Sequence, residues 1–81
     1  MRTRTRFEIE WRDYQKHPPE KAFAVAGDLN GLYVSGVAFG HPSIESAATE
    51  ALQYCEQRRA DRRITSGCRI YATGDVVVHK Q

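Results

Sequence analysis

A chain of 81 residues is too short for more than one ordinary domain. Its 41% hydrophobic and 27% charged residues are typical of a globular protein and argue against general disorder. The net charge of +2 does not by itself indicate nucleic-acid binding, and no apolar run is long enough to cross a membrane. We therefore expect a single domain over residues 1–81, with an N-terminal segment (1–20) and a core (21–80).

The N-terminal segment fits two local structures. Phe7, Ile9 and Trp11 alternate as one side of a strand would, whereas Phe7, Trp11 and Tyr14 share one side of a helix. We favour a short helix that ends before Pro18, because the residue before a proline avoids helical angles. The segment lacks the apolar stretch of a signal peptide, which predicts a cytoplasmic chain and leaves export open if a leader has been removed.

Two strands are predicted next, over residues 21–26 and 32–39, where apolar and β-branched residues are frequent. Residues 27–31 between them are typical of a turn, and Asn30-Gly31 is a pair that tolerates positive φ. The two strands should therefore form an antiparallel hairpin.

A long helix is predicted from Ser43 to about Arg63. The Ser43 side chain can accept a hydrogen bond from a free amide of the first turn. Apolar residues then recur with the helical period as far as Cys55, and residues 56–63 are almost wholly polar. We expect this polar end to extend into solvent and Gly67 to provide the left-handed stop.

The apolar side of this helix consists mostly of alanine, which lets a helix axis come close to a sheet. Gly36, in the middle of a predicted strand, permits the same close approach. We therefore predict that Ala47, Ala48 and Ala51 lie near Gly36.

Residues 68–73 and 76–79 are predicted as the last two strands. A hairpin turn at Gly74-Asp75 is favoured over a β-bulge in one longer strand. The predicted fold is thus α+β: one long helix on a small, mainly antiparallel sheet in β-β-α-β-β order, preceded by a short helix or strand.

A single helix covers only one face of a sheet. The other face would expose aromatic side chains, and a small monomer rarely leaves such a patch bare. Either the N-terminal segment or a second chain should cover it. This candidate interaction face consists of Phe23, Tyr33, Phe39 and Tyr71.

The order of these elements, ending in Cys68-Arg69-Ile70-Tyr71-Ala72-Thr73-Gly74-Asp75-Val76-Val77, resembles a family of small bacterial domains of unknown function. Those domains end in a Cys-x-x-Tyr-Ala-x-Gly-Asp-x-Val-Val type of sequence. The resemblance covers about residues 11–78. It implies a bacterial source and a helix-on-sheet fold, and it is compatible with export, but it supplies no activity and no catalytic residues.

Two cysteines, Cys55 and Cys68, are too few for a disulfide scaffold. They are either a disulfide that joins the helix to the last strands or two buried thiols. We favour thiols, because nothing in the sequence indicates an oxidising compartment.

No motif predicts a catalytic residue, a metal site or a cofactor. The three histidines (His17, His41 and His79) lack the short spacings of metal ligands. Cys68 beside His79 on a neighbouring strand is the one nucleophile and base pair considered, and no motif accompanies it.

Two groups of arginines raise the question of nucleic-acid binding through charge and stacking. Acidic residues interleave with the second group, and a solvated helix end accounts for it without a ligand. The first group is Arg2, Arg4 and Arg6; the second is Arg58, Arg59, Arg62, Arg63 and Arg69.

Three functional hypotheses follow. The first is a non-enzymatic module that uses the sheet face or its edge to dimerise or to dock another protein. The second is nucleic-acid binding through the arginines, and the third is a small enzyme or redox protein. None of the three involves a membrane.

Overall fold

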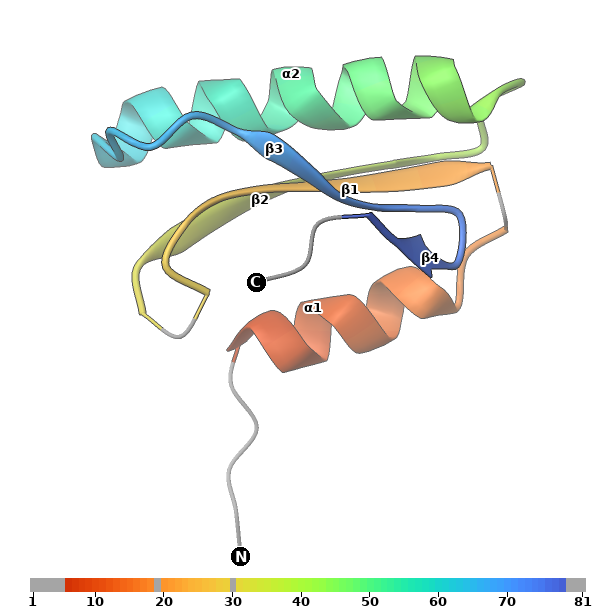
Figure 1. The fold of residues 1–81 in the computed structure, drawn as a ribbon, viewed down its shortest axis with the longest axis horizontal. Helices are drawn as coiled ribbons and strands as arrows, with labels where there is room; N and C mark the ends of the chain where they lie inside the picture. Colours follow the sequence, from red (N-terminus) through yellow and green to blue (C-terminus); the bar gives the residue numbers. More distant parts are fainter. Residues whose placement is uncertain (1–5, 19, 30, 79–81) are drawn as a thin grey trace, which may run out of the picture.

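The computed structural model describes residues 6–18, 20–29 and 31–78, and it places one helix on each side of an antiparallel sheet (Figure 1). The α+β class is confirmed, and the N-terminal segment forms a helix rather than a strand. The elements are α1 (Arg6–Gln15), β1 (Lys21–Gly27), β2 (Tyr33–Phe39), α2 (Ile44–Arg62), β3 (Arg69–Thr73) and β4 (Val76–Val77).

The four strands are arranged in the order β2-β1-β3-β4, so β1 lies between two partners and β2 lies at an edge. This position explains why residues 21–26 are all buried. The β1–β2 hairpin is closed by the Asp28 amide, which donates to the Leu32 carbonyl at 2.9 Å. Leu32 therefore belongs to the loop rather than to β2, and Asn30 lies outside the described residues.

The second hairpin forms as predicted. Gly74 and Asp75 make a turn, Thr73 pairs with Val76, and the Val78 amide continues the pairing by donating to Tyr71 at 2.8 Å. The strand β4 itself is only two residues long, shorter than the predicted 76–79, and His79 lies outside the described residues.

A β-bulge does occur, but within β3. Phe23 of β1 pairs with Ala72, whereas Ala24 pairs with Ile70, so Tyr71 is the extra residue. The bulge directs both Tyr71 and Ala72 towards α1, which increases the aromatic content of that face.

The alternation of β1 and β2 divides the apolar side chains between two cores. The core under α2 consists mainly of small residues, and the core under α1 is largely aromatic. The first contains Ala22, Ala24, Ala26, Val34, Ala38, Ala47, Ala51 and Cys55. The second contains Tyr14, Phe23, Val25 and Ala72, with Phe7, Trp11 and Tyr71 packed against them.

The first turn of α2 is capped as predicted, since the Ser43 hydroxyl accepts the Ser46 amide at 3.2 Å. The other end differs. Arg63, not Gly67, takes the left-handed conformation, with φ of 57°. The Arg63 amide donates to Ala60 and the Ile64 amide to Arg59, a Schellman arrangement that directs Ile64 into the small-residue core. The predicted helix end near Arg63 is therefore confirmed, but Arg63 rather than Gly67 supplies the left-handed residue.

The close approach of α2 to β2 is confirmed. A Cβ atom on Gly36 would lie 2.6 Å from the Cys55 amide nitrogen, and it would also overlap the Ala51 carbonyl oxygen. Ala47 and Ala51 are fully buried in the same core, and Ala48 packs against it. Small residues on both sides therefore bring helix and strand backbones into contact.

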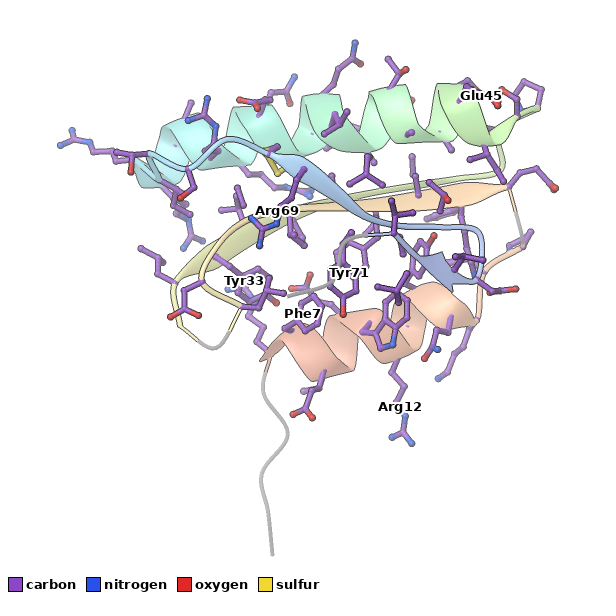
Figure 2. All side chains as sticks on the ribbon, viewed as in Figure 1. Phe7, Arg12, Tyr33, Glu45, Arg69 and Tyr71 are labelled. Atoms are coloured by element: carbon purple, nitrogen blue, oxygen red, sulfur yellow. A yellow bond between two sulfur atoms is a disulfide. The ribbon has the colours of Figure 1, made fainter. Side chains whose placement is uncertain are left out.

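The helix α1 covers the second face of the sheet (Figure 2). The Phe7 ring lies 5.8 Å from Phe23 and 5.1 Å from Tyr71, and the Trp11 ring lies 5.4 Å from both Tyr14 and Tyr71. Of the two covers that the sequence left open, the chain thus uses its own N-terminal helix. Neither described helix combines the length and apolar character needed to cross a bilayer.

The fully buried Lys21 joins α1 to the sheet. Its ammonium group donates to the carbonyls of Tyr14, Gln15 and His17, at 2.9, 3.2 and 2.9 Å, and lies 3.0 Å from an Asp75 oxygen. The Tyr14 and Gln15 carbonyls belong to the last turn of α1, where carbonyls lack i+4 helical partners, and His17 follows the helix. Lys21 therefore acts as a cap supplied by a neighbouring strand.

Candidate functional site

The outer edge of β2 is the feature of this fold best suited to binding. Leu32 directs its carbonyl towards β1, so by alternation Tyr33, Ser35 and Val37 direct their backbone N–H and C=O groups away from β1. Among the described residues no strand pairs with that side. A row of backbone donors and acceptors of this kind can accept a further strand.

A hollow of about 500 Å³ lies along this edge, between α1 and α2. We call it the β2 groove. It is lined by Arg6, Glu10, Tyr33, Val34, Ser35, Val37, Arg58, Asp61 and Arg62.

Glu10 organises the α1 side of the β2 groove. It accepts hydrogen bonds from Tyr33 (2.7 Å) and Ser35 (2.6 Å), and Arg6 lies 3.4 Å away. Burial, and then the hydrogen bond to Glu10, raises the pKa of Tyr33 well above the ordinary value of a phenol. Both Glu10 oxygens therefore already have partners within the protein.

The α2 side of the β2 groove is different. The Arg58 guanidinium donates to the Ser35 backbone carbonyl at 2.7 Å and lies 5.9 Å from the centre of the Tyr54 ring. Its partner is a neutral acceptor on the outer side of β2. Arg62 and Asp61 line the same wall, so the wall carries two guanidinium groups and one carboxylate.

Most of the predicted interaction face is covered by α1, although Tyr33 also lines the β2 groove. Phe23 and Tyr33 are buried, and Tyr71 packs against the core under α1. Phe39 is half exposed, but its ring stacks on that of His17 at 3.9 Å between centres. The physical reason is that α1 brings three aromatic rings of its own to this face.

The predicted arginine surface is divided among several environments. Arg59 pairs with Glu56 at 2.7 Å, and Arg63 ends α2. Arg69 pairs in register with Val25, which places it on the face of the sheet that α1 covers, away from α2. Only Arg58 and Arg62 of this group line the β2 groove; Arg6 joins them, and Arg2 and Arg4 lie outside the described residues.

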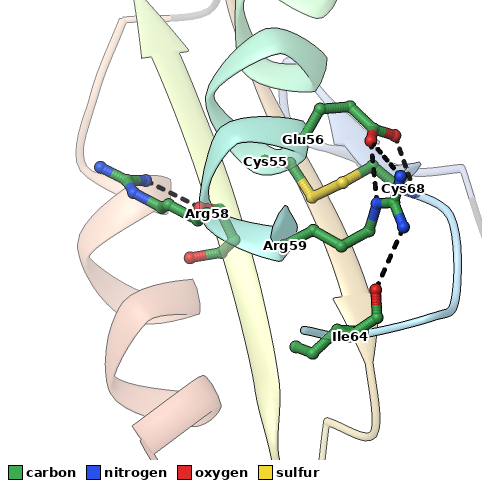
Figure 3. Close-up of a disulfide and its surroundings, with 7 residues drawn as sticks. Cys55, Glu56, Arg58, Arg59, Ile64 and Cys68 are labelled. Carbon is green, nitrogen blue, oxygen red and sulfur yellow. Dashed lines mark hydrogen bonds and ion pairs between the residues drawn. A yellow bond between two sulfur atoms is a disulfide. The ribbon is translucent and has the colours of Figure 1, made fainter. Parts of the chain in front are cut away.

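Cys55 and Cys68 form a disulfide, which ties the middle of α2 to the residue before β3 (Figure 3). The favoured prediction of two thiols is therefore wrong, and Cys68 offers no thiol for nucleophilic attack. The disulfide is flanked by Glu56, which accepts from Arg59 and from the Cys68 amide. The hydrogen bond from Arg59, followed by that from Cys68, lowers the pKa of Glu56.

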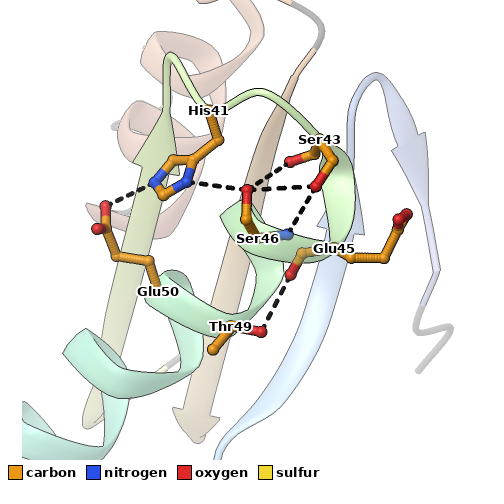
Figure 4. Close-up of polar contacts among 6 residues, drawn as sticks. All are labelled: His41, Ser43, Glu45, Ser46, Thr49 and Glu50. Atoms are coloured by element: carbon orange, nitrogen blue, oxygen red, sulfur yellow. Dashed lines mark hydrogen bonds and ion pairs between the residues drawn. The ribbon is translucent and has the colours of Figure 1, made fainter.

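A serine, a histidine and a carboxylate meet at the start of α2 (Figure 4). The His41 ring lies 3.1 Å from the Ser46 hydroxyl through Nδ1 and 3.0 Å from Glu50 through Nε2. The Ser46 hydroxyl also donates to the Ser43 carbonyl. The sequence spacing of His41 indicates no metal ligand and does not predict this cluster. None of these side chains lines the β2 groove, and the cluster connects the β2–α2 loop to the helix.

No protein-family model matches this chain, and neither a curated protein nor a solved structure shows a significant match. The described residues also bring no three metal-ligating side chains together. The β2 groove is therefore the feature of this fold that bears on its function.

Proposed function

We propose that this domain is a non-catalytic protein-interaction module, which binds an extended segment of another protein along β2. The observation that carries the proposal is the outward-facing edge of β2 at the base of a groove between two helices. Added strands gain affinity from backbone hydrogen bonds and specificity from alternate side chains. The β2 groove provides both outward-facing backbone groups for such hydrogen bonds and neighbouring side chains for specificity.

A structural explanation of Arg58 competes with this proposal. Proteins protect exposed edges with charged side chains, and Arg58 covers one backbone carbonyl of β2 in that way. It covers only Ser35, however, and the contact is made by an exposed side chain. The free energy lost by breaking this exposed hydrogen bond is small compared with the free energy gained from the backbone hydrogen bonds that an added strand would form.

The test is an NMR titration of the ¹⁵N-labelled chain with short blocked peptides of alternating threonine and valine. We expect shifts concentrated at the backbone amides of Tyr33, Ser35 and Val37. The same peptide with N-methylated alternate amides is the control and should lose these shifts, since its donors are blocked. Unchanged β2 amides with every peptide, or equal shifts from the N-methylated control, would refute strand addition.

We further propose that the domain works in an oxidising compartment, in contrast to the cytoplasmic expectation. The Cys55–Cys68 disulfide supports this, because structural disulfides persist outside the reducing cytosol. Alkylating thiols in intact source cells before lysis would test it. Recovery of the chain with both cysteines alkylated would contradict it.

A further inference from the structure

The two walls of the β2 groove differ in how their charges are satisfied. On the α1 wall, Glu10 is engaged by Arg6 and by two hydroxyl groups. On the α2 wall, Arg58 contacts a neutral carbonyl, and Arg62 and Asp61 lie in the same groove, so the wall keeps one positive charge in excess. The α2 wall is therefore where a ligand with negative charge gains most.

The position of Arg58 connects this charge to strand addition. Its guanidinium occupies the Ser35 carbonyl, which is the acceptor that an amide of an incoming strand would need. A carboxylate on the incoming strand would draw Arg58 away and form a charge-assisted pair with it. The vacated carbonyl would then accept the strand's N–H.

A second copy of this chain is a poorer occupant. Pairing of β2 with its own copy around Ser35 would be isologous, so the Arg58 side chains of both copies would meet near the twofold axis. Like charges at the centre of an interface oppose association. A foreign segment that carries a carboxylate has the opposite effect.

We infer that the partner segment bound in the β2 groove is an acidic extended peptide. One of its carboxylates pairs with Arg58 and Arg62, and Arg58 leaves the Ser35 carbonyl to form this pair. This inference rests on the proposed function. It adds the charge of the partner and the residues that select it.

The experiment compares three blocked threonine-valine peptides that differ at one central position: aspartate, asparagine or lysine. We expect the aspartate peptide to bind about tenfold more tightly than the lysine peptide at low salt, and this preference to shrink as salt is added. Arg58→Gln with Arg62→Gln should abolish the preference. Arg12→Gln removes one guanidinium charge from the exposed side of α1, away from the groove, and should leave the preference unchanged (Figure 2).

The outcomes separate the inference from the proposed function. Equal affinity for the three peptides, with shifts at the β2 amides, would overturn the acidic preference and leave strand addition standing. A preference for aspartate that survives Arg58→Gln with Arg62→Gln would also overturn it. Absence of β2 shifts with any peptide would overturn both, as would a concentration-dependent dimer formed through β2 that excludes the peptides.

Discussion

The Cys55 amide nitrogen lies 2.6 Å from the position that a Cβ atom would take on Gly36. Real Cβ atoms do not approach other atoms so closely, and both the strand and the helix meet here through their backbones. Gly36→Ala should therefore push α2 off the sheet and lower the free energy of unfolding by about 3 kcal/mol or more.

Urea unfolding followed by circular dichroism measures this loss. Gly67→Ala is the control, because a Cβ at Gly67 would meet nothing within 4 Å and its φ is not positive. That variant should be neutral or slightly stabilising. An unchanged midpoint for Gly36→Ala would mean that the packing of α2 on β2 is looser than described.

Lys21 should be among the most sensitive polar positions. Lys21→Met removes the ammonium group that donates to three buried or partly buried carbonyls at and just after the end of α1, at a cost of about 2–4 kcal/mol. Asp75→Asn removes only the exposed partner, which water can replace, and should cost under about 1 kcal/mol. Chemical unfolding of both variants tests the ranking, and equal losses would contradict it.

The disulfide should be stabilising. It closes a loop between residues 13 apart in sequence, which in the chain-entropy account contributes on the order of 3 kcal/mol. Adding a reductant should lower the urea midpoint of the wild-type chain, while the Cys55→Ala, Cys68→Ala variant should not respond. Thiol titration of the oxidised, unfolded chain should find no free thiol, and finding two would refute the disulfide.

Much of this architecture was predictable because it depends on local patterns. The Ser43 cap, the alanine side of α2 and the close approach at Gly36 follow from neighbouring residues and helical spacing. The sequence left two candidates for the element that covers the second sheet face: the N-terminal segment and a second chain. The choice depends on the path between α1 and β1, and the Lys21 cap that fixes this path is a tertiary contact.

The β2 groove could not be found in this way. Its residues come from positions 6–10, 33–37 and 58–62, which meet only when the strand order is known. One signal was available: residues 21–26 are apolar almost without alternation, which is typical of a central strand. Recognising this would have placed β1 between two partners and left β2 as a candidate edge.

Alkaline pH should weaken the fold through Tyr33. Its pKa is raised in the folded chain, so the unfolded chain releases the phenolic proton first, near about pH 10. The stabilisation is complete below that pH and is lost as the pH rises above it.

Tyr33→Phe should cost stability at neutral pH, because it removes the hydrogen bond to Glu10. Its stability should nevertheless decline less steeply than that of the wild-type chain between about pH 9 and 11.5. Urea midpoints across this range measure the slopes. An equal slope for Tyr33→Phe and the wild-type chain would refute the assignment.

The end of α2 offers a stabilising substitution. Arg63 takes the left-handed conformation, which costs a residue with a Cβ atom roughly 1 kcal/mol relative to glycine. The fold accepts this cost because the Schellman hydrogen bonds and the packing of Ile64 depend on it. Arg63→Gly should therefore raise the free energy of unfolding by up to about 1 kcal/mol.

Arg62→Gly, one residue earlier and still helical, should lower the free energy of unfolding by a similar amount. Opposite shifts in the thermal midpoints of these neighbours would identify the residue that ends the helix. Destabilisation by both variants would instead place the end of α2 beyond Arg63.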